Sequence, residues 1–209
     1  MNTKTPKASK NTNMSDWIGD QNSVYKTLGA SSHTKEQRQQ DDYYATDPRS
    51  IDYLLEKASP QKDIWECACG EGHLSKRLME LGFNVRSTDL VYRGFGAGGV
   101  DFLSIYAPFK GDIITNPPYK YAKEFVEHSL EILQPGSSAY MFLKLQFLEG
   151  KARRALFETG QLKRVYVSTS RILCAKNGDF ETAQSSAVAY CWYQFEKGYH
   201  GPAVIEWIN

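Results

Sequence analysis

The chain has 209 residues and a mass of 23.7 kDa, which is enough for one substantial domain and too little for two of ordinary size. Its net charge of +1, with 41% hydrophobic and 23% charged residues, is ordinary for a soluble globular protein and excludes a histone-like or acidic-tail protein. The polar N-terminus lacks the apolar core of a secretory signal, and no apolar run approaches the roughly 18 residues of a membrane helix, so we expect a cytoplasmic protein with no membrane partner.

Residues 1–40 are rich in Lys, Asn, Thr and Ser, and we expect them to form a polar, partly disordered arm whose role the sequence leaves open. Beyond the arm, apolar residues recur at helix and strand spacing, which predicts a single domain over 41–209. Helices are predicted from Pro48 onward and over 73–81, 120–133 and 150–159. Strands are predicted over 63–69, 84–90, 111–115, 138–145, 163–169, 187–195 and 204–208.

Strands and helices alternate through most of this domain. That order is typical of α/β folds, in which helices cover both faces of a mostly parallel sheet. The strands predicted over 163–169 and 187–195 have no clear helix between them. We therefore expect a mainly parallel sheet with an antiparallel pair at one edge.

Four cysteines are too few for a disulfide scaffold at this length. Cys67 and Cys69 are separated by a single residue, while Cys174 and Cys191 stand alone. No pair therefore has the spacing of a zinc site. The histidines also lack neighbours at metal-ligand spacing. We expect reduced cysteines and no metal.

The first chemical signal is the turn after the strand predicted over 63–69, which reads Glu66-Cys67-Ala68-Cys69-Gly70-Glu71-Gly72. Its glycines allow a tight turn and close approach of a ligand. Asp89, 17 residues after Gly72, can accept hydrogen bonds from ribose hydroxyls. The third glycine of a dinucleotide motif is missing, and Glu66 would repel a pyrophosphate but suit a cation. The pattern favours S-adenosylmethionine, which carries an ammonium and a sulfonium and no phosphate.

The second signal is Asn116-Pro117-Pro118-Tyr119, directly after the strand predicted over 111–115. Ligands of open α/β sheets bind outside the carboxyl ends of the strands, so this tetrapeptide is expected in the same cleft as the glycine turn. The Asn116 side-chain oxygen and the Pro117 carbonyl can accept both hydrogens of a planar amine. Tyr119 can stack on a flat substrate. Two acceptors draw such an amine toward a more nucleophilic form, and positioning would supply the rate.

With these motifs, the chain resembles the class I S-adenosylmethionine-dependent methyltransferases over about 43–195. Within them it looks most like small phage-type DNA adenine N6-methyltransferases, which carry an N-P-P-Y type tetrapeptide. The resemblance implies a Rossmann-like fold, S-adenosylmethionine as cofactor, DNA as partner, and a catalytic role for Asn116, Pro117, Pro118 and Tyr119. Tyr44 and Thr46 lie in a segment similar to the one that closes over the methionine carboxylate, although Asp47 interrupts the family's Thr-Pro pair.

The resemblance also assigns the cofactor contacts. The glycine turn would hold the methionine end, Asp89 the ribose, and Asp101 with Phe102 the adenine. The full set of expected contacts is Tyr44, Thr46, Glu66, Cys67, Ala68, Gly70, Gly72, Asp89, Leu90, Asp101, Phe102 and Asn116.

Positive charge gathers between residues 144 and 176, where eight basic and two acidic residues give +6 in a chain whose total is +1. Such polarised charge is what a phosphate-binding face requires. The expected nucleic-acid contacts are Lys144, Lys151, Arg153, Arg154, Arg171 and Lys176. A target base in a duplex would have to be flipped out, and the loop over 171–185 is a candidate to fill the gap.

Only 14 residues separate Asp101 from Asn116, which leaves no room there for a large recognition domain. We therefore expect weak or short-site sequence specificity. Three alternatives remain open: another planar amine or amide, such as an RNA base or a protein glutamine; the N4 amine of cytosine; and a non-catalytic binding module.

Overall fold

The computed structural model describes residues 44–176, 178, 180–181 and 188–209. The chain divides into two units, Met1–Ser32 and His33–Asn209, and every described residue belongs to the second. The expected polar arm over 1–40 and most of 177–187 lie outside the described residues, as does the side chain of Lys176.

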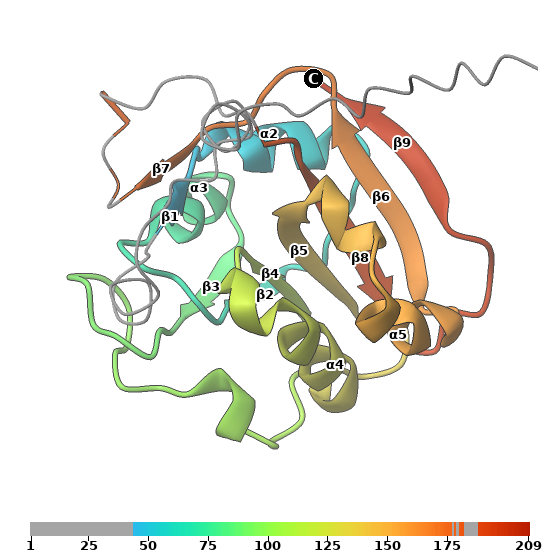
Figure 1. Cartoon of the computed structure of the whole chain (residues 1–209). Helices are drawn as coiled ribbons and strands as arrows, with labels where there is room; N and C mark the ends of the chain where they lie inside the picture. Colours follow the sequence, from blue (N-terminus) through green and yellow to red (C-terminus); the bar gives the residue numbers. More distant parts are fainter. Residues whose placement is uncertain (1–43, 177, 179, 182–187) are drawn as a thin grey trace, which may run out of the picture. The chain divides into compact units, whose positions relative to one another are not determined.

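A mostly parallel sheet forms the centre of the described domain (Figure 1). Its strands, in the order β3-β2-β4-β5-β8-β6-β9 across the sheet, are β3 (Asn84–Ser87), β2 (Asp63–Glu66), β4 (Asp112–Thr115), β5 (Ser138–Lys144), β8 (Tyr190–Glu196), β6 (Leu162–Ser168) and β9 (Val204–Ile208). Neighbours are parallel except that β8 runs antiparallel to both β5 and β6. The predicted α/β class and the antiparallel β6–β8 pair are confirmed, and β9 adds a parallel strand outside that pair.

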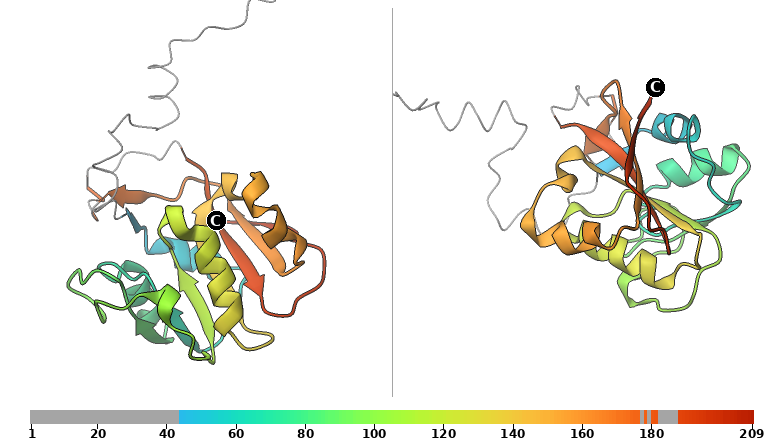
Figure 2. Two further views of the ribbon diagram at one scale, coloured as in Figure 1. Left: turned by 60° about the horizontal axis from the view of Figure 1, so that its bottom comes forward. Right: turned by 90° about the vertical axis from the view of Figure 1, so that its right-hand side faces the viewer.

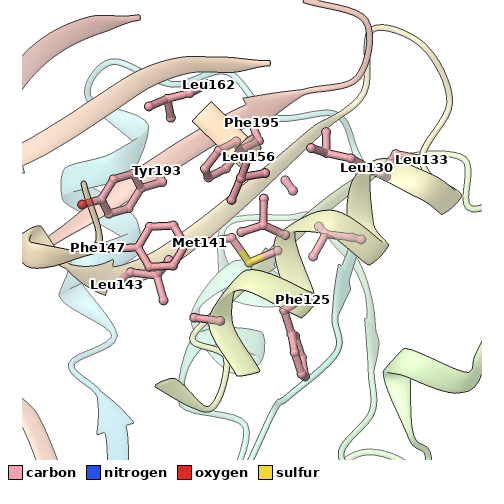
Figure 3. Close-up of a cluster of buried hydrophobic side chains, with 14 of the residues drawn as sticks. Phe125, Leu130, Leu133, Met141, Leu143, Phe147, Leu156, Leu162, Tyr193 and Phe195 are labelled. Atoms are coloured by element: carbon pink, nitrogen blue, oxygen red, sulfur yellow. The ribbon is translucent and has the colours of Figure 1, made fainter. Parts of the chain in front are cut away.

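Helices cover both faces of this sheet (Figure 2). On one face lie α2 (Arg49–Leu55) and α3 (His73–Glu80), whose buried residues include Ile51, Leu54, Leu74 and Leu78. On the other lie α4 (Ala122–Ile132) and α5 (Arg154–Glu158), which pack Phe125, Leu130 and Leu156 against Met141, Tyr193 and Phe195 (Figure 3). These two apolar layers are the core that holds the strand ends in place.

Some predicted element boundaries were wrong. The strand predicted over 63–69 ends at Glu66, because the turn containing Gly70 at φ +54° begins directly after it. The helix predicted over 150–159 is divided, with a 3-10 turn over Lys151–Arg153 before α5. Its start follows Gly150 at φ +124°, a backbone conformation that only glycine adopts readily.

A second, two-stranded sheet was not predicted. Here β1 (Tyr44–Thr46) pairs antiparallel with β7 (Cys174–Lys176), with Thr46 opposite Cys174. The segment over 171–185 was expected to be a loop, yet part of it is this strand. Pairing of β1 and β7 brings together parts of the chain that are about 130 residues apart in sequence.

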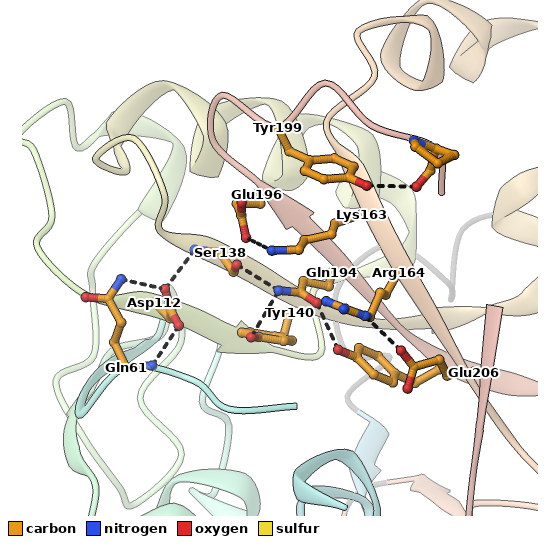
Figure 4. Close-up of polar contacts among 12 residues, drawn as sticks. Gln61, Asp112, Ser138, Tyr140, Lys163, Arg164, Gln194, Glu196, Tyr199 and Glu206 are labelled. Atoms are coloured by element: carbon orange, nitrogen blue, oxygen red, sulfur yellow. Dashed lines mark hydrogen bonds and ion pairs between the residues drawn. The ribbon is translucent and has the colours of Figure 1, made fainter. Parts of the chain in front are cut away.

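A buried polar network connects the sheet at the amino ends of β4 and β5 (Figure 4). The Asp112 carboxylate accepts hydrogen bonds from the backbone N–H groups of Gln61 and Ser138 at 2.8 and 2.7 Å. Gln194 joins the network by donating to Ser138 and accepting from Tyr166. Burial raises the pKa of Asp112 above its usual value. This network lies at the opposite end of the strands from Asn116 and has a structural role.

Candidate active site

Asp89 fastens the glycine turn to the end of β3. Its carboxylate accepts a 2.8 Å hydrogen bond from the Gly70 N–H and a 2.9 Å bond from the Val91 N–H. Gly72 caps α3 at φ +79°, and a Cβ there would overlap the ring of Phe95. The turn is therefore shaped by packing within the protein as well as by any need to admit a ligand.

Removing the Asp89 carboxylate is expected to loosen this turn. The change Asp89→Ala leaves two backbone N–H groups without their acceptor, each loss costing roughly 1–3 kcal/mol where water cannot replace it. We expect a lower thermal midpoint and S-adenosylmethionine binding weakened by at least about tenfold. Calorimetric titration measures the affinity, with Asp63→Ala on the exposed start of β2 as the matched control. Unchanged affinity in Asp89→Ala would contradict the assignment.

Glu66 lies inside the protein rather than at its surface, with 2% of its area exposed. Its carboxyl group accepts a hydrogen bond from the Ser75 hydroxyl, which in turn lies 2.6 Å from the Ser87 hydroxyl. Burial raises the pKa of Glu66 to about 8, although the Ser75 hydrogen bond opposes the shift. The surroundings of this group thus favour its neutral form, and its expected contact with a cationic ligand stays a prediction.

The other expected cofactor residues differ in their placement. Leu90 is 64% exposed, directly after Asp89, and is free to contact a ligand. Cys67 is buried in the core cluster, and Ala68 packs partly against it. Phe102 is also core, with its ring edge-on to Trp65 at 5.2 Å. Asp101 caps a 3-10 turn by accepting from the Leu103 N–H and the Ser104 hydroxyl. Of this group, Leu90 is the side chain most available to a cofactor.

Asn116 follows β4 and is bonded to β1. Its Nδ2 donates to the Tyr44 carbonyl oxygen at 3.2 Å and to Thr46 Oγ1 at 2.9 Å. Its Oδ1 is buried and finds no hydrogen-bond partner among the described residues. A buried acceptor without a donor is costly unless a ligand supplies one, so this oxygen is the strongest sign of a binding function.

Tyr119 packs into an aromatic stack beside Asn116. Its ring lies 5.9 Å from that of Tyr190 with a 27° angle between the planes, and Tyr190 stacks in turn on Phe142 at 5.3 Å. The Lys144 ammonium lies 5.0 Å from the centre of the Tyr119 ring. Burial raises the pKa of the Tyr119 phenol well above its usual value. The tetrapeptide's aromatic ring is thus held in place and stays uncharged.

Tyr190 and Cys174 are site residues that the sequence did not reveal. Tyr190 is the first residue of β8 and lies opposite Lys144 on the neighbouring strand β5. From this position its ring stacks on that of Tyr119. The Cys174 sulfur lies 3.9 Å from the Tyr119 hydroxyl. The only sequence signal for Tyr190 was its place in a predicted apolar strand. No sequence feature pointed to Cys174.

The expected nucleic-acid residues have different environments. Lys151, Arg154 and Arg171 are exposed. Arg154 pairs with Glu158 at 2.6 Å along α5. Arg153 instead turns inward, where its guanidinium donates to the backbone carbonyls of Phe147, Gln146 and Glu149. The geometry thus gives Arg153 a structural role. It leaves Lys151, Arg154 and Arg171 exposed and Lys144 beside Tyr119, and contact of these four with nucleic acid stays a prediction.

Because Arg153 is bonded to backbone carbonyls and Arg154 is exposed, we expect their substitution to affect different properties of the protein. Arg153→Ala removes bonds to three backbone carbonyls and is expected to lower stability by about 1–3 kcal/mol. Arg154→Ala, which removes an exposed side chain, should change stability by less than about 1 kcal/mol. From the charge pattern of the sequence, we also expect it to reduce the salt dependence of DNA binding. Urea unfolding and DNA-binding titrations at two salt concentrations separate the two. Equal loss of stability in both variants would contradict the distinction.

The described part of the chain contains no group of three or more His, Cys, Asp and Glu side chains arranged to hold a metal ion. Among the same residues, no helix has the length and apolar character needed to cross a membrane. The four cysteines, Cys67, Cys69, Cys174 and Cys191, are all free thiols.

No protein-family model and no curated protein sequence matches this chain. Solved structures do match its fold. A proposed RNA methyltransferase from Pyrococcus horikoshii gives a TM-score of 0.52 at 14% identity, over 84% of this chain and 97% of that one. A proposed class I S-adenosylmethionine-dependent methyltransferase from Listeria monocytogenes gives 0.50 at 11% identity, over 77% and 62%. The modification subunit of a proposed type I restriction enzyme from Vibrio vulnificus gives 0.54 at 12% identity, over 80% and 46%.

At these identities the likeness establishes the fold. The chain has the Rossmann-like fold of class I methyltransferases, as predicted. The glycine turn follows β2 and the tetrapeptide follows the neighbouring strand β4, so both lie at the carboxyl edge of the sheet. Ligands of such sheets bind at this edge.

Proposed function

We propose that this chain transfers a methyl group from S-adenosylmethionine to the exocyclic N6 amine of adenine in DNA. The observation that carries the proposal is the buried Oδ1 of Asn116, an acceptor with no partner among the described residues. Asn116 is the first residue of an N-P-P-Y tetrapeptide at the carboxyl edge of a methyltransferase-type sheet. An adenine amine would supply the donor that this oxygen lacks.

The residues present fit the cofactor. Asp89 holds the turn at Gly70 by a hydrogen bond, Leu90 presents an exposed apolar side chain beside it, and Glu66 lies buried at the end of β2. These residues would hold S-adenosylmethionine, with the ribose hydroxyls on Asp89 and the adenine against Leu90. Bound there, the cofactor would supply an electrophilic methyl group.

The chain's own contribution is to position the amine. Asn116 Oδ1 and the Pro117 carbonyl oxygen would accept its two hydrogens, which concentrates the nitrogen lone pair toward the methyl group. Tyr119 would support the flat base, because its ring is fixed by Tyr190. Since Oδ1 is buried, the base reaches it only after the groups that cover it move. A base inside a duplex would also have to be flipped out of the stack.

Two observations favour DNA as the substrate. The exposed cations Lys151, Arg154 and Arg171 follow β5 in the chain, and Lys144 ends β5 beside Tyr119. One structural neighbour is described as the modification subunit of a restriction enzyme. The four free thiols fit the proposed cytoplasmic setting, which holds DNA and RNA alike. Short loops rather than a separate domain would read the sequence, which gives weak or short-site specificity.

An RNA base is the second candidate, because the Pyrococcus horikoshii neighbour is described as an RNA methyltransferase. The tetrapeptide accepts any planar amine and does not distinguish the two. The test supplies tritiated S-adenosylmethionine with unmethylated duplex DNA, single-stranded DNA, RNA or a protein mixture. We expect label in DNA. Label confined to RNA or protein would overturn the choice of substrate, and no label in any of them would overturn the proposed function.

A further inference from the structure

The orientation of the Asn116 side-chain amide is fixed by its neighbours. A backbone carbonyl oxygen can only accept hydrogen bonds, so the end of the amide that faces the Tyr44 carbonyl must be the NH2 group. Thr46 Oγ1 takes the second hydrogen of that group at 2.9 Å. With both hydrogens used on β1, Oδ1 points away from β1 and is left as the unpartnered acceptor.

Thr46 is poorly placed to serve the cofactor instead. Only 2% of it is exposed, and its hydroxyl already accepts the bond from Asn116. Cys174 lies opposite it on β7 and packs beside it. A cofactor carboxylate would reach this hydroxyl only if the groups that bury it moved. The burial of Thr46 and its bond to Asn116 therefore favour the interpretation that Thr46 holds the Asn116 side chain.

We infer that Thr46 is a positioning residue, which holds the Asn116 amide so that Oδ1 faces the substrate amine, and that it is not a ligand of S-adenosylmethionine. The catalytic consequence rests on the proposed function, whereas the orientation rests on the hydrogen bonds alone. The segment that carries β7 helps to hold Thr46 in place, because β1 pairs with β7 and the Asp47 N–H donates to the Leu173 carbonyl oxygen at 3.1 Å.

The kinetic test compares Thr46→Val with Thr46→Ser. Valine has nearly the same shape and removes the acceptor, whereas serine keeps the hydroxyl. We expect Thr46→Val to lower kcat for DNA by about 10- to 100-fold, since a misplacement of about 1 Å costs a catalyst that much. The KM for DNA and the Kd for S-adenosylmethionine should stay within about twofold, and Thr46→Ser should restore most of kcat. A tenfold rise in the Kd with unchanged kcat would overturn the inference.

A second measurement does not depend on turnover. In a ¹⁵N NMR spectrum of the full chain, the Asn116 side-chain NH2 is identified by its loss in Asn116→Ala. We expect Thr46→Val to shift one proton of this group and to speed its exchange, and Thr46→Ser to keep the wild-type signal. An Asn116 signal unchanged in Thr46→Val would overturn the inference. Wild-type protein that shows the expected shifts yet methylates no substrate would overturn only the proposed function.

Discussion

Asn116→Ala is expected to lower kcat for methyl transfer to DNA by about 10²- to 10³-fold, the loss typical when one oriented polar group that stabilises a transition state is removed. The reason is that Oδ1 is the only part of this side chain without a partner among the described residues, and alanine removes it. Affinity for S-adenosylmethionine should change little, because the glycine turn is fastened by Asp89 and not by Asn116. Filter-binding assays with tritiated cofactor measure the rate, and calorimetry measures the affinity.

The same substitution at Asn84 provides the control. Asn84 is exposed at the start of β3 and donates to Asp63, far in sequence from the tetrapeptide. Asn84→Ala should therefore keep the wild-type rate. If Asn116→Ala also kept it, the amine would not be held by Oδ1, and the proposed mechanism would be wrong.

The second large effect concerns stability and pH. The free energy of unfolding should fall as pH rises from about 4.5 to about 8, and Glu66→Gln should remove most of that fall. The raised pKa of about 8 means that the folded protein holds the Glu66 proton more tightly than the unfolded chain does. The stabilisation is thus complete below the unfolded pKa and is lost as pH rises through the folded one. At about 1.4 kcal/mol per pKa unit, the fall is at most on the order of 5 kcal/mol.

Urea unfolding at pH 5, 6.5 and 8.5 measures this slope. Glu66→Gln keeps the shape of the side chain and cannot ionise, so its stability should exceed that of the wild type most at pH 8.5. Glu124→Gln, an exposed acid on α4, is the matched control and should keep the wild-type slope. A slope unchanged by Glu66→Gln would show that the buried carboxyl group is not responsible.

The sequence was sufficient for features set by local pattern. Apolar spacing predicted the strands of the central sheet, and the two motifs fell at the carboxyl ends of β2 and β4 as expected. Glycine turns and prolines mark such ends directly, because they impose backbone conformations that strands cannot continue. This part of the site was therefore predictable without any tertiary information.

Features set by long-range pairing were not predictable. β1 and β7 are three residues each, too short to show an apolar alternation, and their pairing depends on the whole fold. Tyr190 reaches Tyr119 only because β8 runs antiparallel beside β5. Arg153 looks like its neighbour Arg154 in sequence, yet nearby carbonyls draw it inward. Charge and residue type alone do not record the direction in which a side chain turns.

In the proposed reaction, Asn116 presents an acceptor to an adenine amine. The most direct test incubates unmethylated DNA with S-adenosylmethionine and the protein, digests the DNA to nucleosides and identifies them by mass spectrometry. We expect N6-methyladenine from the wild-type protein and none from Asn116→Ala. N6-methyladenine in equal amount from both proteins, or no methylated nucleoside from wild-type protein with cofactor bound, would contradict it.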